Sequence, residues 1–479
     1  MTVAQMEMPV QIETLEKELR QVFTETADEL ARETDFVKRQ RKLSGSIFAQ
    51  ALVFSWLSNP DASYTQIQQM LAVCGCPMSA QGLEQRFTPS AADFLLYLLY
   101  AATQVAMQAE ELNTELLSRF AGVYLQDGSI ISLPNELEGL YQGFGGNTEK
   151  SGKSAMRIQV RLNMQTGELL GPWIQEARMC ERKGAGSFEA NPLPENALRV
   201  CDSHYFTLTE MQRISEQKQW FLTCAKADLT LRDASGVKYD MVQFIKKHEH
   251  KKVIDEWVTI GCTTKTQQRV RLLAFRVSDE TERKRREKVN QDTKVRVKGS
   301  RGDVHVGKKR QRPKEGTHRH RPGKKRIALS GWTILLTNVE EMRLSPFEAR
   351  ALMRCRWQIE LIWRLWKERG QVDIWRSEKS MRILCEIYAK LLAMLVQHWL
   401  MIVGCWSEPH RSLVKASLVV RLLAPTLAIT LSGSVSLHDT LGLCCQAMTS
   451  AKLNTRQKRP STSRLLEDPV LAAGFAAEP

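Results

Sequence analysis

The segment from Ser345 to Gly370 constrains the fold more than any other, because it reads as one amphipathic helix with both ends marked. Ser345 can cap the N-terminus, Glu348 completes a capping box, and Gly370 can end the helix. Ile359 and Trp366 fall on one face at helical spacing. We therefore expect a helix that packs on a core with this face.

A charged triplet follows a neighbouring stripe of the same helix. At about 100° per residue, Arg356 and Glu360 lie roughly 40° apart, and Lys367 falls between them. A carboxylate between two cations suits a metal ion held close to a phosphate backbone. An ordinary exposed ion pair between positions i and i+4 is the alternative interpretation of Arg356 and Glu360.

The excess of positive charge is concentrated in one stretch. The chain of 479 residues has a net charge of +15, and residues 281–326 alone contain 19 Lys or Arg against 5 Asp or Glu. So dense a run of one sign favours a polyanionic partner over a plain solvated linker. We interpret residues 281–326 as a mobile basic arm that contacts nucleic acid.

The composition indicates a cytoplasmic protein. The first residues are acidic and polar, unlike a signal peptide. The most apolar segment, 387–406, is interrupted by polar residues, so it predicts a buried helix rather than a membrane span. The 11 cysteines contain no CxxC pair, which is typical of reduced thiols. We find no glycine-rich phosphate loop and expect no nucleotide cofactor.

The chain changes character near residue 120. The segment before it is helical, with a basic cluster at 38–42, and could form either a DNA-binding domain or a structural cap. After it, residues 156–162 alternate between apolar and polar, which predicts a half-buried strand. Further strands are predicted at 168–176, 198–201, 220–224, 253–262, 270–277 and 332–339, with a helix at 207–218. The tail from Ala451 is polar, and we expect it to be loosely ordered.

Two of the predicted strands lead into an aspartate. The strand Val123–Leu125 delivers Asp127 at its end, and the strand 198–201 ends at Asp202. Either aspartate could instead be a turn residue. Gathered with Glu360, however, they would repel one another unless cations neutralised them. Oxygen ligands select Mg²⁺ or Mn²⁺, and two such ions about 4 Å apart can drive phosphodiester displacement.

These motifs resemble those of the DDE transposases of bacterial insertion sequences, in the large group with a YREK signature. Arg356, Glu360 and Lys367 have the spacing of its last three letters, within RWQIELIWRLWK. LQDGSIISLP resembles the first-aspartate motif, and CDSHYF resembles the second. The sequence departs from the pattern in two places: Met353 replaces the signature tyrosine, and Ser203-His204 follows the second aspartate instead of the commoner arginine-glycine.

The resemblance implies an α/β fold with a ribonuclease H-like mixed sheet flanked by helices, a β-rich insertion and a helical N-terminal domain. The domains it implies are 1–118, helical and DNA-binding; 119–218, the first part of the core; 219–330, the insertion with its basic arm; 331–425, the second part of the core; and 426–479, the C-terminal tail.

The resemblance also implies a reaction and its residues. Asp127, Asp202 and Glu360 would be catalytic and would hold Mg²⁺, two ions in all, with Mn²⁺ as a substitute. The substrate would be double-stranded DNA, both terminal inverted repeats and target, and the protein would act as a homodimer on DNA. Four residues would contact the DNA: Arg356 and Lys367 at phosphates, and Trp332 and Trp357 by stacking, unless these tryptophans only pack in the core.

Two other functions stay open at this point. A transposase-derived repressor would bind DNA without cutting it, and Met353 weakly favours this reading. A nuclease of the same fold would cut DNA without joining the freed 3′ end to a target.

Overall fold

The computed structural model describes residues 10–39, 42–112, 114–145, 152–261, 267–299, 323–431, 433, 435–454 and 460–473; for 291–299 it describes the backbone alone. The chain divides into two compact units. Unit 1 comprises residues 1–118, 122–193 and 356–458, and unit 2 comprises 119–121, 194–355 and 459–479. Each unit is described by itself below.

Unit 1 combines a helical bundle with a sheet. Its helices are α1 (Val10–Gln21), η1 (Val22–Thr26), α2 (Ala27–Glu33), α3 (Gly45–Ser58), α4 (Tyr64–Val73), α5 (Ala80–Glu84), α6 (Pro89–Ala102), α7 (Glu115–Ser118), η2 (Asn135–Leu137), α13 (Trp357–Arg364), η5 (Leu365–Arg369), α14 (Ser380–Met401), η6 (Ile402–Trp406), α15 (Leu413–Leu431) and α16 (Leu437–Met448). Its strands are β1 (Val123–Leu133), β2 (Ser154–Asn163) and β3 (Leu169–Glu176).

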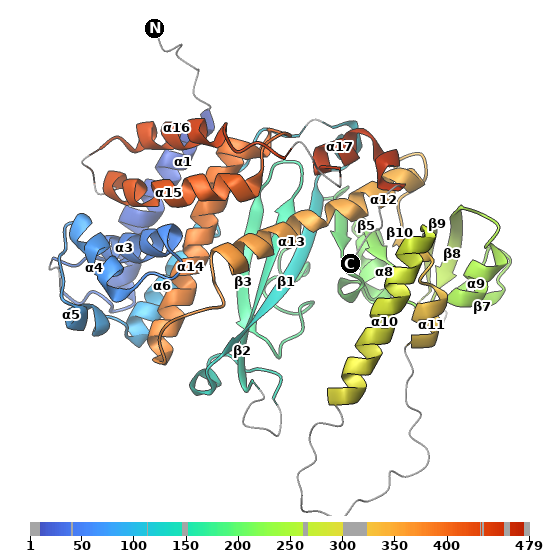
Figure 1. Cartoon of the computed structure of the whole chain (residues 1–479), viewed down its shortest axis with the longest axis horizontal. Coiled ribbons are helices and arrows are strands. Elements are labelled where there is room, and N and C mark those ends of the chain that lie inside the picture. The colour runs from blue at the N-terminus through green and yellow to red at the C-terminus, as the bar shows by residue number, and fades with distance from the viewer. Residues whose placement is uncertain are drawn as a thin grey trace, which may run out of the picture. The chain divides into compact units, whose positions relative to one another are not determined.

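The bundle is built around α14, which packs against both α3 and α6, while α15 packs against α3 and α16 (Figure 1). Ser44 and Thr88 accept hydrogen bonds from backbone N–H groups in the first turns of α3 and α6, so each helix begins at a side-chain cap. The N-terminal helices and the late helix α14 therefore share one apolar core, although they are far apart in sequence.

The sheet of unit 1 has the order β3-β2-β1 and is antiparallel. The prediction that residues 156–162 form a strand is confirmed, but the prediction that it is half-buried is wrong, because all of β2 is buried. The loop from Ala177 to Leu193 covers the polar face: Gln126 donates to the backbone oxygen of Gly186 (2.7 Å), and Arg161 donates to that of Asn191 (2.8 Å). Hydrogen bonds to the loop replace the water that the alternation had suggested.

Unit 2 has strands in the order β4-β5-β10-β9-β8-β6-β7, in which β4 and β5 are parallel and the other described pairs are antiparallel. Its strands are β4 (Leu198–Cys201), β5 (Trp220–Cys224), β6 (Thr230–Arg232), β7 (Lys238–Asp240), β8 (Val253–Ile260), β9 (Gln268–Arg276) and β10 (Trp332–Thr337). Its helices are η3 (Ser203–Tyr205), α8 (Leu208–Glu216), α9 (Met241–Lys247), α10 (Asp279–Gly299), α11 (Gly323–Ala328), α12 (Pro346–Cys355), α17 (Thr462–Glu467) and η7 (Pro469–Ala473).

The mixed α/β fold class is confirmed, and β4, β5 and α8 lie where the sequence predicted them. Two expectations need correction. The segment 345–370 is not one helix: it is interrupted at Arg356, where the chain passes from unit 2 to unit 1. The tail is not loosely ordered throughout, because α17 and η7 pack against α12 within unit 2. Half of the predicted basic arm, residues 300–322, lies outside the described residues, and the described parts of the arm belong to α10 and α11 (Figure 1).

Among the residues that the structure describes, two helical stretches are long and apolar enough to cross a membrane by length and composition alone. The first, Ser380–Trp406, is entirely buried within the protein, which confirms the prediction of a buried helix there. The second, Leu413–Leu431, is partly exposed.

Candidate functional site

Asp127 lies within β1 rather than at its end, which corrects the sequence prediction. The strand continues to Leu133 because Ile131 and Leu133 are apolar and the whole run pairs with β2, with Asp127 opposite Val160. The Asp127 carboxylate accepts a hydrogen bond from the N–H of Gly128 (2.9 Å). Asp127 is therefore part of an ordered sheet and not a turn residue.

The electrostatic surroundings of Asp127 are unusual for a surface carboxylate. Burial raises the pKa of Asp127 to about 6, although the Gly128 N–H and the Arg356 guanidinium oppose the shift. The Glu360 carboxylate acts in the same direction as burial. A partly buried acid with another acid beside it is costly to ionise without a cation.

Helix α13 brings Glu360 to this strand. The helix packs against β1, with Ile359 and Ile362 buried in the interface, as the apolar spacing predicted. Arg356 and Glu360 form an ion pair at 2.5 Å, with side chains 18% and 46% exposed. Asp127, Arg356 and Glu360 thus lie in one neighbourhood within unit 1.

Lys367 lies beyond the regular α-helix on which its expected place between Arg356 and Glu360 was based. The helix changes at Leu365 to a π-helical turn, η5, which alters the angle between successive residues. Within the described part of the chain, the ion-pair partner of Lys367 is Asp373, at 3.8 Å. Asp373 was not among the residues predicted from the sequence.

Asp202 belongs to unit 2. It directly follows β4, as predicted, and its side chain is half-exposed. The hydroxyl of Ser203 donates to the Asp202 carboxylate (3.0 Å), and His204 Nδ1 lies 3.6 Å from it. Asp202 precedes η3 without capping it through its side chain.

The donor set fits a hard divalent cation, because a bound cation would offset the cost of ionising Asp127 beside Glu360. Among the described residues, no group of three or more His, Cys, Asp and Glu side chains could hold a metal ion as it stands. Asp127 and Glu360 belong to one unit and Asp202 to the other. Their joint action therefore stays a prediction.

The two candidate stacking residues differ in exposure. Trp332 begins β10 and is 5% exposed, with the guanidinium of Arg276 5.6 Å from its ring centroid. Trp357 begins α13 and is 38% exposed. Met353, at the tyrosine position of the signature, is buried in α12. Trp357 is thus the more accessible of the two aromatic rings.

A polar layer that the sequence pattern did not predict lies beneath Asp127. Gln126 is fully buried and accepts a hydrogen bond from Arg161 Nε (2.9 Å), while its amide contacts Gln159 (3.2 Å). Arg161 also lies over the ring of Phe188 at 4.2 Å. The signal was present in residue type, because the alternating polar positions of β2 contain Arg, Gln and Asn but neither Lys nor Glu.

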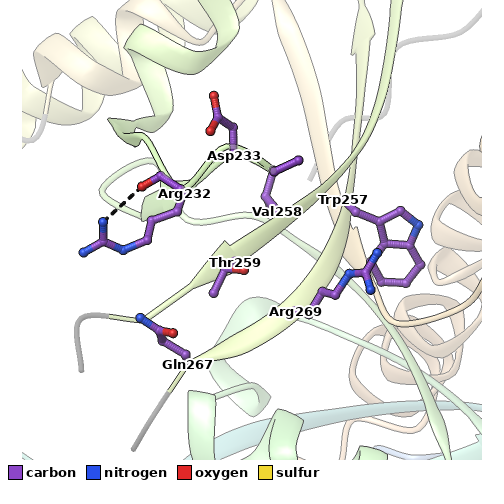
Figure 2. A pocket seen from close by; sticks show the side chains of 9 residues that line it. Arg232, Asp233, Trp257, Val258, Thr259, Gln267 and Arg269 are labelled. Carbon is purple, nitrogen blue, oxygen red and sulfur yellow. Dashed lines mark hydrogen bonds between the residues drawn. The ribbon is translucent and has the colours of Figure 1, made fainter. Parts of the chain in front are cut away.

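Unit 2 contains a separate hollow of about 400 Å³ on β6, β8 and β9 (Figure 2). Its wall includes Trp257 with the Arg269 guanidinium 5.0 Å from the ring centroid, and Arg232, which donates to the Gly236 backbone oxygen (3.3 Å). None of the three predicted carboxylates lines this hollow.

Comparison with known proteins agrees with the resemblance in the motifs. Residues 118–396 match the model of the transposase DDE domain, which is more than half of the chain. The chain is 24% identical to the transposase for insertion sequence element IS231F of Bacillus thuringiensis subsp. israelensis over 398 residues, which cover 79% of this chain and 77% of that protein.

Two further relatives are similar over comparable lengths. The transposase for IS231C of Bacillus thuringiensis subsp. berliner is 25% identical, covering 77% of this chain and 75% of the relative. The transposase for IS1151 of Clostridium perfringens is 20% identical, covering 81% and 80%. With a mixed α/β fold, the expected acid motifs and a domain match across both units, the chain belongs to the DDE transposase family.

Proposed function

We propose that the protein is the transposase of an insertion sequence: it binds the terminal inverted repeats, cleaves DNA at the element ends and joins the freed 3′ ends to target DNA. The observation that carries the proposal is the placement of Glu360 and Arg356 beside Asp127 through the packing of α13 on β1. The family match and the names of the relatives support the same reaction class.

Asp127, Asp202 and Glu360 are the residues that would hold Mg²⁺, or Mn²⁺ in its place. When bound, two such ions supply activation of the attacking oxygen and stabilisation of the leaving oxygen. The raised pKa of Asp127 supports this role, because a ligand that is costly to ionise alone becomes favourable beside a cation.

Cationic and aromatic residues would position the DNA. The Arg356 side chain is 18% exposed beside Glu360, and the Lys367 side chain is about one-third exposed, so both would reach a phosphate. Trp357 is exposed enough to stack on an unpaired base, whereas Trp332 would first have to leave its buried position. The N-terminal helices would recognise the terminal repeats, and two protomers would act together on paired ends in the cytoplasm.

A cleavage assay on the DNA that flanks the gene tests this function. Wild type and Asp202→Ala would each be incubated with labelled end fragments, in Mg²⁺ or in EDTA, together with a target plasmid. We expect cutting at the element ends, and covalent joining to the plasmid, only with wild type and metal. Cutting without any joined product would identify a nuclease, and tight binding without cutting in Mg²⁺ or Mn²⁺ would identify a repressor.

A further inference from the structure

Helix α14 contains a buried ion pair to which the proposed reaction gives no role. Lys390 and Glu386 are 2% and 4% exposed, and their charged atoms lie 2.7 Å apart. Lys390 Nζ also donates to the backbone oxygens of Gln371 (3.2 Å) and Ile374 (2.7 Å). A buried ammonium is costly unless its donors are used, and here two of its hydrogen bonds go to one short turn.

This turn directly follows the helical segment that carries Lys367. Gly370 packs so tightly on α14 that a Cβ atom there would lie 2.5 Å from the sulfur of Met394. Gln371 adopts a positive φ of 47°, a conformation that costs a residue with a side chain some backbone strain. Asp373 lies within the turn and forms the ion pair with Lys367.

The far end of the connecting segment is held separately. Arg376 forms an ion pair with Asp61, and Lys379 forms one with Glu84 at 2.5 Å. Asp61 lies in the turn between α3 and α4 and Glu84 lies in α5, and both belong to unit 1. Lys390 donates hydrogen bonds to two carbonyl groups of the Gln371–Ile374 turn itself.

We propose that Lys390 is a positioning residue, which fixes the Gln371–Ile374 turn so that Asp373 orients the ammonium of Lys367 toward a DNA phosphate. Lys367 is a flexible side chain, and a single ion pair at 3.8 Å orients it only if Asp373 is itself immobile. The inference rests on the proposed contact between Lys367 and a DNA phosphate. It adds Lys390 as the residue that fixes the geometry of this contact.

A mutant cycle in the full-length protein tests the coupling. Glu386→Leu with Lys390→Met removes both buried charges together, so that neither is left without its partner. This pair of substitutions, Lys367→Ala, and all three combined would be compared with wild type in single-turnover cleavage of end DNA, with the DNA Kd measured separately. The matched control is Lys415→Met, because Lys415 also donates to a loop carbonyl, that of Lys452 (2.7 Å).

We expect the paired substitution to lower the cleavage rate divided by Kd about tenfold, which corresponds to the loss of one ordered charge-assisted contact. The combined variant should lose no more than Lys367→Ala, and Lys415→Met should match wild type. Losses that multiply in the combined variant would overturn the inference, because Lys390 would then act independently of Lys367. Unchanged cleavage in the paired variant would overturn it as well.

Hydrogen exchange of the free protein gives a readout that does not depend on activity. In the paired variant, backbone amides of residues 371–376 should exchange about tenfold faster, while those in the middle of α14 keep their protection. Unchanged exchange in the turn would show that Lys390 does not hold it. If instead Lys367→Ala alone cut and bound DNA like wild type, the proposed role of Lys367 would fail, and with it the purpose assigned to Lys390, even where the turn is released.

Discussion

Two ion pairs join residues four positions apart, one at the start of helix α13 and one within helix α14, and their environments are opposite. Arg356, which directly precedes α13, and Glu360 within it have side chains that are 18% and 46% exposed. In α14, Glu386 and Lys390 are almost completely buried. The exposed pair contributes little to stability but stays open to a substrate, whereas the buried pair is stable only when its polar atoms are bonded. Two ion pairs with the same spacing of four residues therefore have different roles.

The largest expected effect comes from the acid of the exposed pair. Glu360→Gln removes a charge that would hold the metal, and we expect end cleavage in Mg²⁺ to fall by on the order of 10³-fold. Glu368→Gln is the matched control, because Glu368 is exposed in the following turn. Single-turnover cleavage of labelled end DNA measures both. If Glu360→Gln retained cleavage within tenfold of wild type, Glu360 would not be a metal ligand.

Removing only one partner of the buried pair should lower the stability of the protein. Lys390→Met leaves the Glu386 carboxylate buried without its cation, so we expect the free energy of unfolding to fall by about 3 kcal/mol. Adding Glu386→Leu should recover most of this loss. Urea denaturation at pH 7 measures the three proteins. If the single and the paired variants were equally stable, the buried ion pair would not be the source of the penalty.

His398 extends the comparison to a buried group in α14 that is neutral. Burial lowers its pKa to about 4, and its Nε2–H donates to the backbone oxygen of Gly167 (2.8 Å). Between pH 6.5 and pH 4 the unfolded chain binds a proton at this residue that the folded chain does not. Stability is therefore lost as the pH falls, by about 2 kcal/mol between pH 7 and pH 5 from this group.

His398→Gln keeps a hydrogen-bond donor but cannot be protonated. The difference in the free energy of unfolding between wild type and this variant, followed from pH 7 to pH 5, isolates the contribution of His398. A difference that does not change over this range would contradict a depressed pKa for His398.

These residues also show what sequence reasoning reached and where it stopped. The capping box formed by Ser345 and Glu348 could be predicted from the sequence, because it depends only on residues close together in the chain. Its two hydrogen bonds are present at 3.4 and 2.7 Å. The resemblance to the DDE transposases grouped Glu360 with Asp127, and the packing of α13 on β1 brings the two into one neighbourhood. The continuation of β1 past Asp127 could not be read, because it depends on pairing with β2, a long-range contact.

Burial was the second quantity that the sequence did not determine. The polar residues of β2 were interpreted as solvent-facing, but the loop from Ala177 to Leu193 covers them. Lys390 is one of the polar residues that interrupt the apolar run 387–406, and the sequence did not predict its two carbonyl partners, since they belong to a turn whose path depends on Gly370 and Gln371. A pattern predicts which residues share a face, whereas tertiary packing decides what that face meets.

The smallest expected effect on stability belongs to the base of the exposed pair, and it sharpens the contrast most. Arg356→Ala breaks an ion pair at a partly exposed site, so the free energy of unfolding should change by less than about 1 kcal/mol. Its DNA affinity should nevertheless fall for any sequence, with a shallower salt dependence, because a phosphate contact is lost. Urea denaturation and binding titrations at several salt concentrations measure the two quantities. A loss of stability as large as that of Lys390→Met, with unchanged DNA binding, would make Arg356 a structural residue and erase the distinction between the two helices.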